Sequence, residues 1–252
     1  MLTAATHVHT HVDDATHDHP AADSDGVWPR PWEPAAPIDL SGVPGVTADQ
    51  QARAEALVAS TMVHLPQFAD VSTVEALGFR SIGDASSGYE HYLNDEFLGD
   101  DAFLDPNRPE SLVYQVDGER RMLVSAMYVA TDIALDDPQL VDYGGPLMQW
   151  HVHDNLCWEL DDGGRPVVAG VTGEDGTCAP GTVKAGERSP MVHVWIAPHE
   201  CGPFAALEGH GAGQTTGDGT RPTSARTSTP PPRRRRPSST RPRPWTCRAP
   251  RE

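Results

Sequence analysis

The chain has 252 residues and a formal net charge of −17, from 19 Lys and Arg against 36 Asp and Glu. The acidic residues lie mostly before residue 211, so the folded domain should repel nucleic acid and anionic membranes and attract cations. We therefore expect no nucleic acid as a partner of the folded domain, and the charge agrees with a metal ion as its partner. No run of about 18 apolar residues is present, which excludes a membrane-spanning helix of ordinary length.

Residues 1–37 are rich in His, Asp and Pro and are predicted to form a disordered leader, because the tract over residues 7–19 has almost no apolar content and the prolines after it favour an extended chain. The tract over residues 7–19 predicts weak capture of zinc, copper or nickel. The alternatives are a solvated low-complexity leader or upstream sequence exposed by a misassigned start codon. The first residues do not read as a signal peptide, although metal capture favours an extracytoplasmic location. The tract's ligand candidates are His7, His9, His11, Asp13, Asp14, His17, Asp18 and His19.

A single α+β domain is expected over residues 38–210, with a mainly antiparallel β-sheet and N-terminal helices packed on one side. The first helix should begin after Thr47, whose hydroxyl can cap it while Gln50 reaches back, and should end at Pro66.

A second, short helix is predicted over residues 72–77, with Ser72 and Glu75 as its capping box. The segment after it contains Gly88-Tyr89-Glu90-His91-Tyr92, which we interpret as surface aromatics flanking a turn. Alternatively, His91 completes a metal ligand set and Glu90 acts as a general base on bound water.

Beyond this point the pattern favours strands. Two β-rich runs over residues 111–116 and 122–129 flank Asp117-Gly118, which is a strong hairpin signal. Further strands are predicted over residues 147–153, 166–171 and 191–196. These runs account for most of the expected sheet.

Histidines in two of these strands form the candidate metal site. Successive side chains of a strand point to opposite faces, so His151 and His153 should emerge on the same side. His193 alternates with aliphatic residues in the last strand. If that strand lies beside the first pair, three imidazoles converge into the ligand set of an open zinc or copper site. The alternative is histidines satisfied by neighbouring carbonyls and carboxylates. His199 follows in a loop, where it is a fourth ligand or an exposed side chain.

The site also has candidate supporting groups. Asp154 and Glu208 could orient the ligating imidazoles, or lie in a solvated turn and helix. Cys157, Cys178 and Cys201 are candidates for a disulfide, and a bridge from either of the first two to Cys201 would clamp the two histidine-bearing segments together. Buried thiols and a metal-ligating Cys157 thiolate are the alternatives.

Residues 211–252 contain no Val, Ile, Leu, Phe, Met or Tyr and are predicted to be a disordered Arg- and Pro-rich tail. Its composition is that of a shifted reading frame of GC-rich DNA, so we interpret it as a frameshift product. The alternatives are a basic arm that binds polyanions, built around residues 233–236, and an ordinary tail.

The motifs HVHDNLCW, VHVWIAPHECGPFAALEG, GYEHY and DPNRPESLVY resemble a family of uncharacterised proteins from high-GC bacteria, over about residues 38–214. The resemblance implies a single domain behind a histidine-rich leader and carries no established activity. The chain departs from that family after Gln214, where similar proteins continue with a short end bearing Cys and His.

The leading hypothesis is therefore a zinc- or copper-binding protein for metal capture or buffering, with the leader as a low-affinity collector. The first alternative is a metalloenzyme that activates water or oxygen at an open three-histidine site, with Glu90, Asp154 or Glu208 moving protons. The second is a non-catalytic structural or interaction domain whose histidines are internal hydrogen-bond partners. The sequence does not indicate which metal, which substrate or which oligomeric state.

Overall fold

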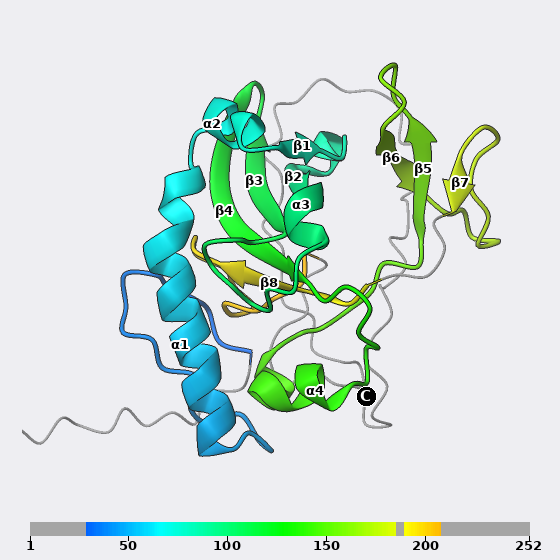
Figure 1. The fold of residues 1–252 in the computed structure, drawn as a ribbon. Helices are drawn as coiled ribbons and strands as arrows, with labels where there is room; N and C mark the ends of the chain where they lie inside the picture. The colour runs from blue at the N-terminus through cyan, green and yellow to red at the C-terminus, as the bar shows by residue number, and fades with distance from the viewer. Residues whose placement is uncertain (1–28, 185–188, 208–252) are drawn as a thin grey trace, which may run out of the picture.

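A computed structural model describes residues 29–184 and 189–207. Within them the chain has an α+β fold of two antiparallel sheets with helices on one side (Figure 1). The helices are α1 (Ala48–His64), α2 (Val71–Ala76), α3 (Asp95–Leu98) and α4 (Pro138–Gly144), with 3-10 turns at Leu65–Phe68, Ala85–Ser87 and Gly145–Leu147. The strands are β1 (Phe79–Ser81), β2 (Tyr89–Asn94), β3 (Ser111–Asp117), β4 (Arg120–Val129), β5 (Leu156–Leu160), β6 (Pro166–Val171), β7 (Val183–Lys184) and β8 (Met191–Trp195).

Helix α1 begins where the sequence predicts it. The hydroxyl of Thr47 accepts the backbone N–H of Gln50 at 3.2 Å, and the Gln50 side chain accepts the backbone N–H of Thr47 at 2.9 Å. This capping box satisfies two donors that would otherwise lack a partner at the helix start. Thr61 near the other end is hydrogen-bonded to the Tyr128 hydroxyl at 2.9 Å, which fastens the helix to β4.

The main sheet has the strand order β1-β2-β3-β4-β8, and all its neighbours are antiparallel. Its centre is the predicted hairpin of β3 and β4, in which Asp117 pairs with Arg120. Gly118 adopts a φ of +59° in the two-residue turn, a conformation that glycine reaches without steric cost. The hairpin prediction is confirmed, and it supplies the two strands that lie between the site strands.

A second, three-stranded sheet with the order β6-β5-β7 stands away from α1 on the other side of the molecule (Figure 1). We call residues 156–184 the arm. The backbone N–H of Val168 in β6 donates to the carbonyl of Ile82 at 2.6 Å, so the arm is joined to the main sheet next to β1. A disulfide between Cys157 and Cys178 closes the arm internally.

The segment before α1 corrects one prediction. Trp32 is 5% exposed and belongs to the hydrophobic core, and its backbone exchanges hydrogen bonds with His199. The Trp32 indole N–H also donates to the carbonyl of Trp195 at 2.8 Å. The prediction of a disordered leader extending to residue 37 is therefore wrong over residues 29–37, because one large aromatic anchors this stretch.

Two further local predictions need correction. The second helix is capped by Asp70, whose carboxylate accepts the N–H of Thr73 at 2.8 Å, and not by Ser72. The expected strand over residues 147–153 does not form, and His151 makes only a single bridge to Met191. The glycines and the proline of Gly144-Gly145-Pro146 instead turn the chain into a 3-10 helix just before it.

The prediction of surface aromatics flanking a turn over residues 88–92 is wrong, because only Gly88 belongs to a turn. Residues 89–94 form β2, which pairs with both β1 and β3, and Glu90 and His91 are 7% and 6% exposed. Tyr89, His91 and Leu93 share one face of this strand, and Glu90, Tyr92 and Asn94 share the other. This strand brings His91 into the interior of the fold.

Several predictions lie outside the described residues: most of the leader, the tail over residues 211–252, and Glu208. In the described part of the chain, every helix is too short or too polar to span a bilayer. The expectation of no membrane span agrees with this.

Candidate functional site

Four histidines form a continuous cluster in the interior of the fold. The Nε2 atoms of His91 and His193 lie 3.4 Å apart. The ring of His151 is stacked on that of His193 with centroids 5.5 Å apart, and His153 packs edge-on against His151 at 5.1 Å. The structure thus brings His151, His153 and His193 together, and with them His91, which the sequence offered as an alternative ligand.

The cluster depends on the curvature of the main sheet. His91 in β2 and His193 in β8 are separated by β3 and β4, which is about 14 Å across a flat sheet. His91 pairs with Val113 and Val113 pairs with Ser125, so these two side chains occupy the same face in the intervening strands. Ser125 in turn pairs with Trp195, and His193 is two positions before Trp195 on that face of β8. The sheet must curl for the two imidazoles to meet over these smaller side chains, as twisted sheets do.

The protonation state of two rings follows from their partners. The Asp84 carboxylate lies 2.5 Å from Nδ1 of His91, and the carbonyl of Gln149 lies 2.8 Å from Nδ1 of His151. A carbonyl and a carboxylate accept, so both Nδ1 atoms donate, and in the neutral ring Nε2 then carries the lone pair. This arrangement, in which the outer nitrogen is fixed by an acceptor, is the one that metal-ligating histidines commonly have.

His193 is fully buried, and its environment keeps the ring neutral. Burial lowers the pKa of His193 well below its ordinary value, and the neighbouring His151, His91 and His153 lower it further. Its Nδ1 atom has no hydrogen-bond partner among the described residues. A neutral imidazole is the form that can bind a metal.

The distance between the Nε2 atoms of His91 and His193 matches the distance between two ligands of one zinc ion. Two nitrogens on one tetrahedral zinc ion, each at about 2.0–2.1 Å, lie about 3.3–3.4 Å apart. The distance between the His91 and His193 Nε2 atoms is 3.4 Å. In the described ranges, however, no three His, Cys, Asp or Glu side chains already have donor atoms arranged around one point. The stacked His151 ring would have to rotate to contribute a third nitrogen.

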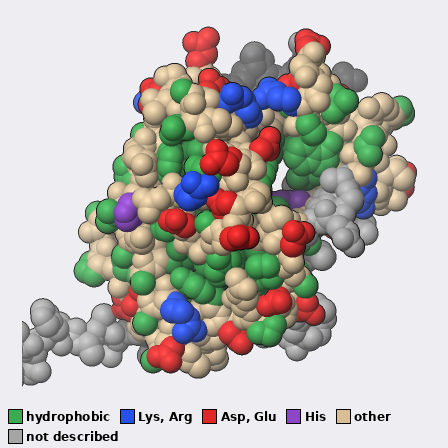
Figure 2. All heavy atoms as spheres, viewed as in Figure 1, with side chains coloured by type: hydrophobic (Ala, Val, Ile, Leu, Met, Phe, Trp, Pro, Cys, Tyr) green, Lys and Arg blue, Asp and Glu red, His purple; other side chains and the backbone are tan. Residues whose placement is uncertain are grey.

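The cluster has a solvent-facing side. His153 is half-buried, whereas His91 and His151 are 6% and 8% exposed. Figure 2 shows histidine at the bottom of the hollow between the main body and the apolar side chains of the arm.

Two of the three predicted proton-transfer residues, Glu90 and Asp154, make no hydrogen bond to the cluster within the described structure. Glu90 precedes His91 in β2, so its side chain lies on the opposite face of the sheet. There its carboxylate accepts hydrogen bonds from Arg121 and from the Ser81 hydroxyl. Asp154 is exposed. Glu208 lies outside the described residues. Glu90 is thus part of a structural ion pair.

His199 lies beside the cluster rather than in it. Its ring packs on Trp195 with centroids 4.3 Å apart, and its Nδ1 accepts the backbone N–H of Cys201 at 3.1 Å. Burial lowers the pKa of His199 to about 4. The ring of Trp195 in turn borders His193, at 6.3 Å between centroids. His199 therefore supports the aromatic wall of the site.

The cysteines are arranged differently from the predicted clamp. Cys157 pairs with Cys178 inside the arm, and Cys201 is completely buried near the end of β8. Pairing of Cys157 or Cys178 with Cys201 is therefore wrong, and a disulfide-bonded Cys157 is no thiolate ligand. The two histidine-bearing segments are held instead by the backbone bonds between His151 and Met191.

Sequence reasoning missed Asp84, which holds His91 from a loop. Nothing in the spacing of seven residues between Asp84 and His91 indicates their contact, because it arises from a loop folded back on β2. His91 itself was detectable from the alternating pattern of residues 89–94.

Comparisons of the chain with protein-family models, with curated proteins and with solved structures find no match.

Proposed function

We propose that this protein binds a transition metal, zinc or copper, through its histidine cluster, and that it serves metal capture or buffering. His91 and His193 would supply the first two nitrogens. His151 or His153 would turn to supply the third. The His- and Asp-rich tract of residues 7–19 would collect the ion with low affinity before transfer.

The observation that carries this proposal is the 3.4 Å separation of the His91 and His193 Nε2 atoms. These atoms come from two strands that are not neighbours, and both rings are buried. Polar rings in such a place cost free energy unless they have partners. A shared metal ion would satisfy both nitrogens at once, and imidazole is a preferred ligand of zinc and copper.

The orientation of the rings is the second support. Nδ1 of His91 faces a carboxylate and Nδ1 of His151 faces a carbonyl, so the lone pair of each neutral ring lies on Nε2. Acceptors behind ligating histidines fix their tautomer and raise their basicity.

A competing function has one specific observation in its favour. The same 3.4 Å distance fits an N–H donated by His193 to His91, which would make the cluster a structural hydrogen-bonded core of a non-catalytic domain. This alternative leaves the second nitrogen of the His193 ring buried and without a partner among the described residues.

Metal loading of the full chain distinguishes the two. We expect the purified protein to retain a tightly held zinc or copper ion after passage over a chelating resin, and the double variant His91→Gln/His193→Gln to lose it. Elemental analysis gives the stoichiometry, and competition with a chromophoric chelator gives the affinity. The leader is present in both proteins, so its contribution cancels.

The matched control is His64→Gln, since His64 is on α1 and its ring is hydrogen-bonded only to Ser60 in the described structure. This variant should hold as much metal as the wild type. Equal metal in the double variant, with an unchanged circular dichroism spectrum, would overturn the proposal. If the double variant does not fold, thermal unfolding of the wild type decides, because a ligand at about 100 times its Kd stabilises the native state by about 2.7 kcal/mol. No stabilisation by zinc or copper would favour the structural core.

A further inference from the structure

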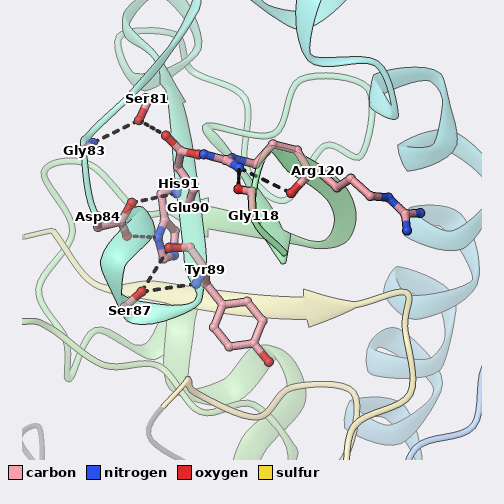
Figure 3. A network of polar contacts seen from close by, with 10 residues as sticks. Ser81, Gly83, Asp84, Ser87, Tyr89, Glu90, His91, Gly118 and Arg120 are labelled. Carbon is pink, nitrogen blue, oxygen red and sulfur yellow. Dashed lines mark hydrogen bonds and ion pairs between the residues drawn. The ribbon is translucent and has the colours of Figure 1, made fainter. Parts of the chain in front are cut away.

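The loop between β1 and β2 carries a carboxylate that holds His91 at two points. One oxygen of Asp84 accepts the backbone N–H of His91 at 2.9 Å, and the other lies 2.5 Å from the ring nitrogen Nδ1. Figure 3 shows Asp84 facing His91 from this loop, with both contacts drawn. Both the backbone and the ring of this histidine are thus fixed by one side chain.

A hydrogen-bonded network holds the loop in place. The Ser81 hydroxyl donates to Glu90 at 2.6 Å and accepts the backbone N–H of Gly83 at 3.0 Å (Figure 3). Arg121 binds the other oxygen of Glu90. Glu90 and His91 are neighbours on opposite faces of β2. The ion pair on one face therefore fixes the loop that orients the imidazole on the other.

The arm presses on the same loop. Gly83 has a φ of +81°, and a Cβ built on it would lie 3.3 Å from Cβ of Val167. Only glycine combines this backbone conformation with so close an approach. Together with the bond from Val168 to Ile82, this packing leaves Asp84 little freedom to move away from His91.

We propose that Asp84 is a positioning residue that fixes the tautomer of His91, so that the ring presents an unprotonated Nε2 toward His193. This inference rests on the proposed function, since it assigns to the metal site its outer-sphere carboxylate. Asp84 does not contact the ion. It acts through the imidazole, by accepting the Nδ1 proton and leaving the lone pair on the opposite nitrogen.

Asp84→Asn is the informative change because an amide cannot accept at both positions. The backbone N–H of His91 is an obligatory donor, so the amide oxygen must face it, and the NH₂ group then faces Nδ1. Two donors cannot pair, but the ring can move its proton to Nε2. The variant would keep the geometry and reverse the tautomer, as the corresponding change of aspartate to asparagine does in the serine protease triad.

The first measurement needs no metal. In the metal-free, ¹⁵N-histidine-labelled full chain, ring correlation spectra should show His91 protonated at Nδ1, with the signal assigned by its absence in His91→Gln. In Asp84→Asn the proton should lie on Nε2. The control Asp101→Asn alters an exposed aspartate and should leave the wild-type pattern. A wild-type His91 protonated at Nε2 would overturn the inference even if the variant does not fold.

The second measurement is zinc affinity by chelator competition. Loss of an outer-sphere partner typically weakens metal binding about 10- to 100-fold, and we expect this for Asp84→Asn but not for Asp101→Asn. A reversed tautomer with unchanged affinity, or an unchanged tautomer, overturns the inference. A wild type that binds no zinc or copper tightly overturns the proposed function instead, while the tautomer measurement still decides what Asp84 does.

Discussion

Glu110, just before β3, is a carboxyl group in an apolar setting. It is 3% exposed, and its Oε2 atom accepts the backbone N–H of Val129 at 3.1 Å. Burial raises the pKa of Glu110 to about 7, and the nearby Asp100 and Asp105 carboxylates add to the rise. At neutral pH the fold therefore carries a partly ionised group that its surroundings disfavour.

The sign of the resulting pH dependence follows from linkage. The folded state holds the Glu110 proton up to about pH 7, whereas the unfolded chain releases it near its ordinary value of 4.5. Stability from this group is present below pH 4.5 and is lost as the pH rises through 7, by at most roughly 3 kcal/mol. In Glu110→Gln we expect the free energy of unfolding to fall less than in the wild type between pH 5 and 8, as measured by urea titration. Glu119→Gln, at an exposed position, should behave like the wild type, and an identical pH dependence in Glu110→Gln would refute the assignment.

At the scale of elements, the arm differs from the main sheet in how it is held. Most residues of β6 and β7 are exposed, including Val171 and Val183, so little apolar area stabilises these strands. The Cys157–Cys178 disulfide closes a loop with a sequence separation of 21. A crosslink of this size stabilises a fold mainly by restricting the unfolded chain.

Removal of this crosslink should loosen the arm selectively. In the double variant Cys157→Ser/Cys178→Ser we expect the opening free energy of β5 and β6 amides to drop by roughly 3 kcal/mol, because the unfolded arm regains the chain entropy that the crosslink removes. Hydrogen exchange monitored by mass spectrometry resolves this by segment. Amides of β3 and β4 should keep their protection, and a uniform loss across both sheets would show that the arm and the main sheet unfold as one unit.

For the whole molecule, the segment before α1 closes the core. Trp32 pairs through its backbone with His199 and through its indole with the carbonyl of Trp195, so it ties the chain before α1 to the loop after β8. Trp195 donates its own indole N–H to the carbonyl of Ala205 at 2.7 Å. Trp195, which borders the histidine cluster, is therefore held by the segment before α1 and by the segment after β8.

Trp32→Ala should therefore destabilise the entire domain. We expect the free energy of unfolding to fall by about 3–5 kcal/mol, because a large buried side chain is removed and a cavity remains. Urea unfolding should show a lower midpoint with an unchanged slope. Glu33→Ala, at the exposed neighbouring position, should change stability by no more than about 0.5 kcal/mol, and a similarly small effect of Trp32→Ala would mean that the segment does not contribute to the core.

Local sequence signals determined the elements that are stabilised by their own residues. The Thr47 and Gln50 capping box, the stop at Pro66 and the turn at Gly118 all act within a few positions of the chain, so pattern and turn chemistry were sufficient to predict α1 and the β3–β4 hairpin. The predicted meeting of His151, His153 and His193 is observed as well, although the strand over residues 147–153 on which that prediction rested does not form.

Only the tertiary structure decided the contacts that depend on curvature and loop folding. His91 meets His193 because the sheet curls across two intervening strands, and Asp84 meets His91 because its loop folds back under the arm. Trp32 is ordered by partners more than 160 positions away. Such contacts are set by packing between distant segments, whose energies no local pattern contains. This is why the sequence indicated histidines for the candidate site but not the contacts of His91 with His193 and Asp84.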